Sequence, residues 1–150
     1  MKKIRQQFAD LMLEVGTRDK KLVVLVGDIS HGILQPFAKK CPTRYYNIGI
    51  CEPSIVNMAA GLSKSGLNPV VHTIAPFITE RAFEQIKLDF GYQKQNVNLI
   101  SVNVSDELSH PIRGFLVGSL VSYSNIHLSV LPNPDCIGLL FGIYILALFI

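Results

Sequence analysis

The sequence predicts an α/β fold in which a mostly parallel sheet is flanked by helices. Short aliphatic runs of strand length alternate with segments of helical periodicity along the first two thirds of the chain. The clearest of these runs, LVVLV at 22–26, is apolar throughout, which is typical of strands covered on both faces. Strands separated by helices imply right-handed crossovers and parallel pairing. With 150 residues and 49% hydrophobic composition, the chain can bury a real core.

The expected elements follow in order. Apolar residues recur at helical spacing near the amino terminus: Ile4, Phe8, Leu11, Met12 and Val15. Gly16 is expected to end this first helix. Pro53 occupies a favoured first helical position, and Gly66 is expected to end the helix that it begins. The remaining expected elements are strands at 22–28, 45–50, 68–74 and 96–102 and helices at 33–40 and 77–90.

The composition changes near residue 104. Residues 1–104 carry 21 of the 25 charged side chains, and residues 105–150 carry the other four. We therefore expect a domain at 1–104 and a divergent apolar tail at 105–150. The last fifteen residues would form about 22 Å of helix, which is short of a hydrocarbon core of roughly 30 Å and disfavours a membrane anchor.

Several classes of function lack support in the sequence. The basic residues are scattered, and the net charge is only +3, so nucleic-acid binding is not indicated. Three widely spaced cysteines, Cys41, Cys51 and Cys136, indicate neither a disulfide framework nor a metal site and favour a reducing, cytoplasmic compartment. The amino terminus lacks the apolar stretch of a signal peptide. Nucleotide-binding glycine motifs and the GxSxG motif of hydrolases do not occur.

The expected strand exits carry the candidate site residues, because ligands of parallel sheets collect at the carboxyl ends of the strands. Glu52 follows one strand, between Cys51 and Pro53. Burial there would favour its neutral form, whereas the adjacent helix amino terminus would favour the carboxylate. Asp28 follows another strand and could either cap a helix or contact a ligand. Phe77, after a third strand, is either a core residue or a stacking platform.

Two histidines lie near the same edge of the expected sheet. His72 sits within an apolar strand, and there a hydrogen-bonded core histidine is a commoner finding than a catalytic base. His31 follows Asp28 on a loop and could face a substrate.

Taken together, these segments resemble one enzyme family. The order FADLMLEVGTRDKKLVVLVGDIS, then RYYNIGICEPSIVNMAAGLSKSGLNPVVHTIAPFITERAFEQIKLDFGYQKQNVNLISV, is similar to transketolases over about residues 4–102. It is most similar to their separately encoded carboxyl-terminal sections. The resemblance implies a pyrimidine-binding (Pyr) domain, which holds the aminopyrimidine of thiamine diphosphate.

The resemblance also implies roles for individual residues. ICEPSIVNMAAGL matches the family pattern around the catalytic glutamate, which falls on Glu52. Asp28 matches the family's acid after the first long strand, and Ile29 beside it joins the implied cofactor-binding set. Phe77 matches the aromatic that stacks on the pyrimidine. Ile74 stands where the family has a second aromatic, a departure that should weaken stacking without removing the pocket.

The implied chemistry needs a second protein domain. In this family the glutamate exchanges a proton with the pyrimidine N1′, which activates the cofactor to attack a ketose. The diphosphate and its Mg²⁺ are bound by a separate domain with a Gly-Asp-Gly motif, and this chain has no such motif and no expected metal ligands of its own. The resemblance thus implies a partner subunit, an oligomer and a sugar phosphate substrate, with transfer of a two-carbon ketol unit.

After residue 102 the sequence leaves the family pattern. We expect a truncated domain, and one hypothesis is that the reading frame shifts near codon 103. Alternatives to a transketolase are a deoxyxylulose-phosphate synthase, the beta chain of a 2-oxoacid dehydrogenase, and an inactive truncated or membrane-tethered remnant.

Overall fold

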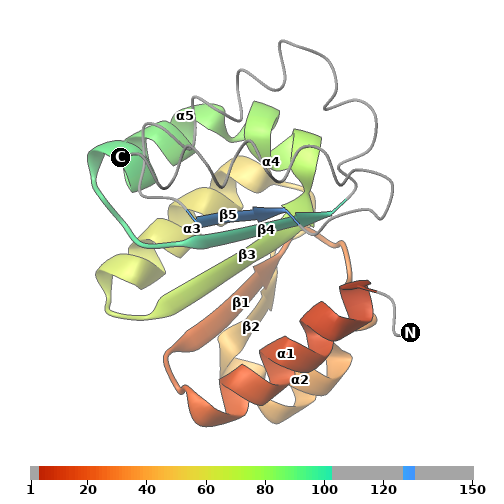
Figure 1. Cartoon of the computed structure of the whole chain (residues 1–150). Helices are drawn as coiled ribbons and strands as arrows, with labels where there is room; N and C mark the ends of the chain where they lie inside the picture. The colour runs from red at the N-terminus through yellow and green to blue at the C-terminus, as the bar shows by residue number, and fades with distance from the viewer. Residues whose placement is uncertain (1–3, 103–126, 131–150) are drawn as a thin grey trace, which may run out of the picture.

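Five parallel strands form one sheet in the order β2-β1-β3-β4-β5 (Figure 1). The structure is a computed structural model that describes residues 4–102 and 127–130. The strands are β1 (Leu22–Val26), β2 (Tyr45–Asn47), β3 (Asn68–Ile74), β4 (Asn98–Val102) and β5 (His127–Val130). This arrangement confirms the predicted parallel α/β fold.

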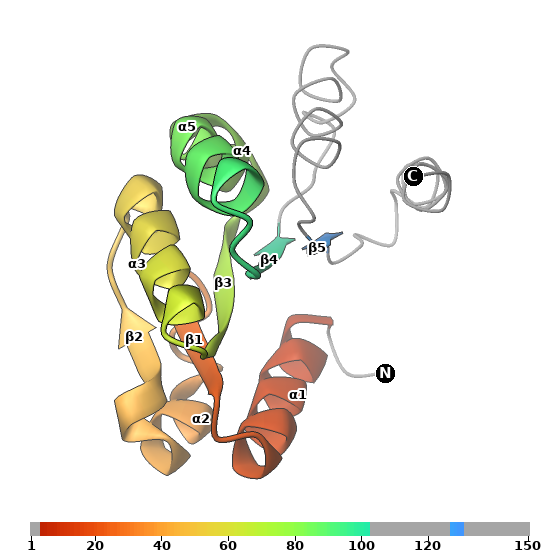
Figure 2. The same ribbon diagram turned by 90° about the vertical axis from the view of Figure 1, so that its left-hand side faces the viewer.

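Helices cover both faces of the sheet (Figure 2). One face carries α1 (Ile4–Arg18) and α2 (Gln35–Lys40), and the other carries α3 (Glu52–Lys64), α4 (Ala75–Arg81) and α5 (Phe83–Gln85). A short 3-10 helix at Pro42–Arg44 precedes β2, and a π-helix at Ile86–Tyr92 continues from α5. The layers explain why β1 is apolar at every position, since all five of its residues are buried.

Each face of the sheet has its own hydrophobic core. Val23 and Leu25 of β1 pack on the side of α3, with Ile55 of that helix. Val24 of the same strand packs on the opposite side, with Phe37 of α2. The alternation of side chains along a strand therefore decides which helices each residue contacts, and the same rule governs the polar residues at the strand ends.

The first helix differs from its expected end. α1 continues through Gly16 to Arg18, so the prediction that Gly16 stops the helix was wrong. A Cβ at this position would lie 2.3 Å from Cε2 of Phe37. Glycine is needed here because α1 and α2 approach closely. Gly66, by contrast, follows the end of α3 with φ of +83°, which confirms it as the terminator of that helix.

Two other elements are shorter than expected. The strand predicted at 45–50 pairs only over Tyr45–Asn47, after which the chain turns through Gly49 with φ of +82°. The helix predicted at 77–90 is divided into α4, α5 and the π-helix, with the first break at Ala82, where φ is −109° and ψ is 15°. The break makes Arg81 the last residue of α4, so that its side chain lies at a helix end.

The predictions for 105–150 lie outside the described residues, except that β5 pairs in parallel with β4. Among the residues that the structure does describe, no helix is both long enough and apolar enough to cross a membrane.

Candidate functional site

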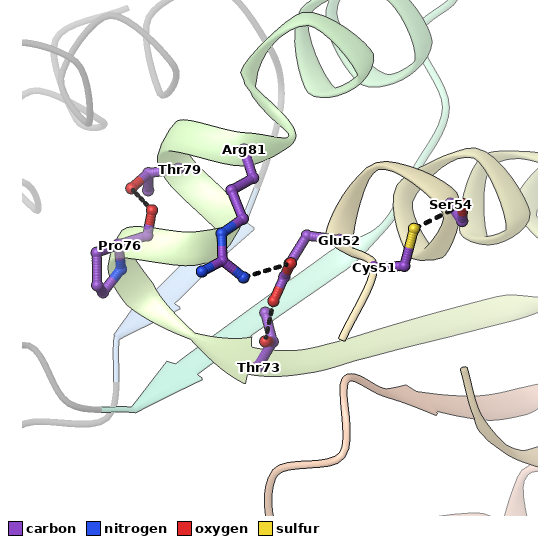
Figure 3. Close-up of polar contacts among 7 residues, drawn as sticks. All are labelled: Cys51, Glu52, Ser54, Thr73, Pro76, Thr79 and Arg81. Carbon is purple, nitrogen blue, oxygen red and sulfur yellow. Dashed lines mark hydrogen bonds and ion pairs between the residues drawn. The ribbon is translucent and has the colours of Figure 1, made fainter. Parts of the chain in front are cut away.

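Glu52 is a buried carboxylate at the carboxyl end of the sheet, with 1% of its surface exposed. It is the first residue of α3. Thr73 Oγ1, from the end of β3, donates a hydrogen bond of 3.1 Å to Glu52 Oε1. Arg81 Nη1, from the end of α4, donates to Glu52 Oε2 at 3.4 Å (Figure 3). Both oxygens of the carboxylate therefore have a donor, as burial requires.

Arg81 gives Glu52 an ion-pair partner that its neighbours in sequence do not supply, since its Nη1 lies 3.4 Å from Glu52 Oε2. Arg81 lies 29 residues away in sequence, and its side chain is 46% exposed. The ion pair is thus asymmetric, with one partner inside the protein and the other at its surface.

Phe77 and Ile74 lie beside this ion pair. Phe77 is partly buried on α4, and the guanidinium carbon of Arg81 is 3.7 Å from the centroid of its ring. Ile74 is partly buried at the N-cap position of α4. The structure therefore brings Phe77 and Glu52 together through the side chain of Arg81.

Gly27 makes room for the hydroxyl that orients Glu52. A Cβ at Gly27 would lie 3.0 Å from Thr73 Oγ1 and 3.2 Å from Ile55 Cδ1. Contacts this close would push Thr73 or the helix aside. The exit of β1 thus packs directly against the hydroxyl that holds Glu52.

Asp28 lies at the next position but has different partners. It is exposed, with φ of 65°. Asn47 clamps it, because the backbone N–H of Asp28 donates to Asn47 Oδ1 and Asn47 Nδ2 donates to Asp28 Oδ1, both at 3.1 Å. The N–H of Gly49 donates to the Oδ1 of Asn47 as well, at 3.1 Å. No helix begins at Asp28, since α2 starts at Gln35, so the capping alternative was wrong. The adjacent Ile29 is partly buried.

A buried hydrogen-bond network lies beneath this loop. His72 Nδ1 is 2.9 Å from the carbonyl oxygen of Ile100, to which it must donate. His72 Nε2 therefore accepts from the hydroxyl of Ser30 at 2.9 Å, and that hydroxyl accepts from Nη2 and Nε of Arg5 at 2.9 and 3.3 Å. Burial lowers the pKa of His72 to about 4. Its ring is packed 4.5 Å from that of Phe8.

The network holds a backbone conformation that would otherwise be unfavourable. Ser30, like Asp28, has a positive φ, in this case 59°. A serine in the left-handed region persists where its surroundings fix it. Arg5 and His72 supply that constraint for the loop that carries Asp28.

His31 is exposed on the same loop as Asp28. Its Nδ1 lies 2.9 Å from Tyr45 Oη, and Gln35 Nε2 donates to its Nε2 at 3.0 Å. Burial raises the pKa of Tyr45, and the charge of Asp28 adds to the effect. The histidine is therefore engaged with its own neighbours.

Within residues 4–102 and 127–130, no group of three or more histidine, cysteine or acidic residues could hold a metal ion. Cys41 is buried and Cys51 is exposed, and both are free thiols.

The sequence model described as "Transketolase, pyrimidine binding domain" matches residues 1–107. The chain belongs to this family. A 1-deoxy-D-xylulose-5-phosphate synthase from Syntrophomonas wolfei subsp. wolfei is 39% identical over 95 residues, covering 63% of this chain and 15% of that protein. One of the subunits of an apulose-4-phosphate transketolase from Phocaeicola vulgatus is 35% identical over 100 residues, covering 66% of this chain and 32% of that protein.

A solved structure of the transketolase family has the same fold. It is described as a split gene transketolase, inactive beta4 tetramer, and matches with a TM-score of 0.60 at 35% identity, covering 66% of this chain and 33% of that one. The chain thus spans between 15% and 33% of the length of these three proteins. The family resemblance and the fold that it implied are confirmed, and membership indicates thiamine-diphosphate dependence.

The roles of the site residues stay predictions. Thr73 and Arg81 are contacts of Glu52 that the sequence reasoning missed. Two patterns in the sequence could have predicted these contacts. Alternation along β3 puts Thr73 on the face of Val71, toward α3, and spacing of four residues puts Arg81 above Phe77 on one helix.

Proposed function

We propose that this chain is the pyrimidine-binding part of a transketolase-like enzyme that transfers a two-carbon ketol unit between sugar phosphates. The supporting observation is the buried carboxylate of Glu52, held by Thr73 at the ligand-binding edge of a domain of this family. When bound, thiamine diphosphate supplies a nucleophilic carbon and an electron sink for the ketose.

The side chains around Glu52 fit the aminopyrimidine ring of that cofactor. A planar ring with a basic nitrogen needs a carboxyl group to share its proton and an aromatic face to stack on. Thr73 fixes Glu52 Oε1, so that Oε2, which Arg81 contacts in the free chain, is the oxygen that exchanges the proton with the ring nitrogen. Phe77 supplies the stacking face, and Ile74 supplies apolar contact where the family has a second aromatic. Burial of Glu52 keeps water from competing for that proton.

The diphosphate and Mg²⁺ would be held by a partner subunit. The sequence contains no Gly-Asp-Gly motif. The Phocaeicola relative is itself one subunit of a transketolase, and the solved neighbour is described as an inactive beta4 tetramer of a split gene transketolase. These descriptions support a chain that assembles into an oligomer and has no turnover until a diphosphate-binding subunit joins it.

Reconstitution tests this proposal. The chain would be mixed with a candidate diphosphate-binding subunit, Mg²⁺ and thiamine diphosphate, and ketol transfer between sugar phosphates would be measured. Glu52→Gln should lower kcat by roughly 10²- to 10⁴-fold, because an amide cannot exchange the proton. Glu84→Gln, which changes an exposed glutamate on α5, is the matched control and should leave kcat unchanged. Equal rates for wild type and Glu52→Gln would refute the proposal.

A second candidate is a deoxyxylulose-phosphate synthase, favoured by the 39% identity to the Syntrophomonas enzyme. Glu52 would act on the cofactor in the same way. The two activities differ in the donor, so the same reconstituted enzyme would be tested with pyruvate and a triose phosphate. Release of CO₂ together with formation of deoxyxylulose phosphate, in place of ketol transfer, would select the synthase.

A further inference from the structure

The guanidinium group of Arg81 makes two contacts at once. Its carbon lies 3.7 Å from the centroid of the Phe77 ring. Its Nη1 donates to Glu52 Oε2 at 3.4 Å, the contact drawn in Figure 3. Stacking on an aromatic ring and donation to a carboxylate are typical of arginine. Phe77 and Glu52 are also the two groups that the proposed function assigns to the aminopyrimidine of the cofactor.

The two groups would compete for the same atoms. A guanidinium and an aminopyrimidine are both flat and rich in nitrogen, and each places a nitrogen against a carboxyl group: the guanidinium donates N–H to it, and the ring nitrogen shares its proton. Glu52 Oε1 is already bonded to Thr73, so Oε2 is the atom that an incoming ring must reach. The guanidinium sits on that oxygen and within stacking distance of Phe77. A ring using the same face of Phe77 and the same oxygen has to displace it.

We propose that Arg81 is an internal stand-in for the aminopyrimidine, which closes the pyrimidine site in the free chain and swings outward when the cofactor binds. This inference rests on the proposed function. Displacement is feasible because Arg81 is the last residue of α4 and its side chain is 46% exposed. An arginine at a helix end can move into water without opening the core.

Movement of Arg81 also changes the contacts of Glu52. While the guanidinium is in place, it occupies Glu52 Oε2. Once it leaves, the buried carboxyl group faces a ring nitrogen with which it can share a proton. Arg81 therefore remains the partner of Glu52 until the aminopyrimidine binds and replaces it.

The contacts to be broken set the size of the effect. An ion pair 3.4 Å long whose arginine is 46% exposed, together with the cation–π contact of the same arginine, corresponds to roughly a three- to thirty-fold loss of affinity for the displacing ligand. Removing the arginine should therefore raise the affinity for the pyrimidine by the same factor, roughly three- to thirty-fold.

Calorimetric titration of the full chain with 4-amino-5-hydroxymethyl-2-methylpyrimidine tests the inference, because this probe lacks the diphosphate and needs neither partner nor metal. Arg81→Ala should bind it roughly three- to thirty-fold more tightly than wild type. The matched control is Lys87→Ala, which removes a cation 5.9 Å from the ring of Phe83 and should leave binding unchanged. Binding by Arg81→Ala that is equal to wild type, weaker or absent would overturn the inference.

A second measurement uses the wild-type chain and does not depend on the folding of a variant. The NMR signal of the Arg81 guanidinium should be shifted by the ring current of Phe77 in the free chain, and it should move to an ordinary position as the pyrimidine saturates the site. A signal that stays in place at saturation would overturn the inference. If the Glu52→Gln effect on the reconstituted enzyme persists in that case, the proposed function stands and only the role of Arg81 is lost.

Discussion

His72 should make the folded chain sensitive to acid over a defined range of pH. Its side chain is fully buried, and burial lowers its pKa from 6.5 to about 4. In the unfolded chain this histidine titrates near its ordinary value, so between the two pKa values the unfolded state binds a proton that the folded state does not. The stability is therefore complete above pH 6.5 and is lost as the pH falls toward 4. The difference corresponds to about 3 kcal/mol.

Urea unfolding followed by circular dichroism measures this loss. The free energy of unfolding would be determined from pH 7 down to about 4.5 for wild type and for His72→Asn. The asparagine amide can still donate to the carbonyl of Ile100 but does not titrate. Wild type should lose about 2–3 kcal/mol more than the variant over this range. His31→Asn, which changes an exposed histidine, is the control and should follow the wild-type curve.

Parallel curves for wild type and His72→Asn would refute the reasoning, because they would mean that His72 titrates alike in the folded and unfolded chains. If the variant fails to fold at pH 7, NMR of wild type gives the same answer. The ring protons of His72 should not shift between pH 7 and about 5, and a midpoint near 6.5 would contradict its burial.

Two further predictions concern packing and the orientation of the buried carboxylate, and both are measured by urea unfolding at neutral pH. Gly16→Ala would place a Cβ 2.3 Å from an atom of Phe37 and should lower the free energy of unfolding by about 1–3 kcal/mol. Gly61→Ala, on the exposed side of α3 with nothing within 4 Å, should instead raise it by about 0.5–1 kcal/mol, and equal effects would contradict the close contact of α1 with α2. Thr73→Val keeps the shape of the side chain, removes the donor to Glu52 Oε1 and should lower the free energy of unfolding by about 1–3 kcal/mol, so a neutral result would show that this bond is absent.

The fold could be predicted from local patterns where one residue type decides the structure. The run of five buried aliphatic residues in β1 has the length of a strand and is too short for an ordinary helix, and β3 spans the predicted residues 68–74. Gly16 shows the limit of such reasoning. A glycine that ends a helix and one that admits a neighbouring ring look alike in sequence, and only the approach of Phe37 from another helix distinguishes them. The break at Ala82 was also beyond reach, because residues 77–90 contain neither glycine nor proline.

The sequence predicted the main residues of the candidate site, but it did not predict which side chains contact them. Glu52 and Phe77 follow strands, so the rule that ligands meet at strand ends selects them. The partners of Glu52 lie 21 and 29 residues away, at Thr73 and Arg81, and the spacing between segments does not encode which atoms meet. The clamp by Asn47 was missed because its side chain bonds across two strand exits.

The hydroxyl of Ser30 is saturated, since it accepts two N–H groups from Arg5 and donates its proton to His72. It therefore cannot form a further hydrogen bond with a ligand. Its three hydrogen bonds hold the loop that carries Asp28 in place. A loop fastened in this way loses its conformational freedom during folding and not during binding. Whatever meets Asp28 therefore encounters a preorganised surface, and the entropic cost of arranging that surface does not weaken the complex.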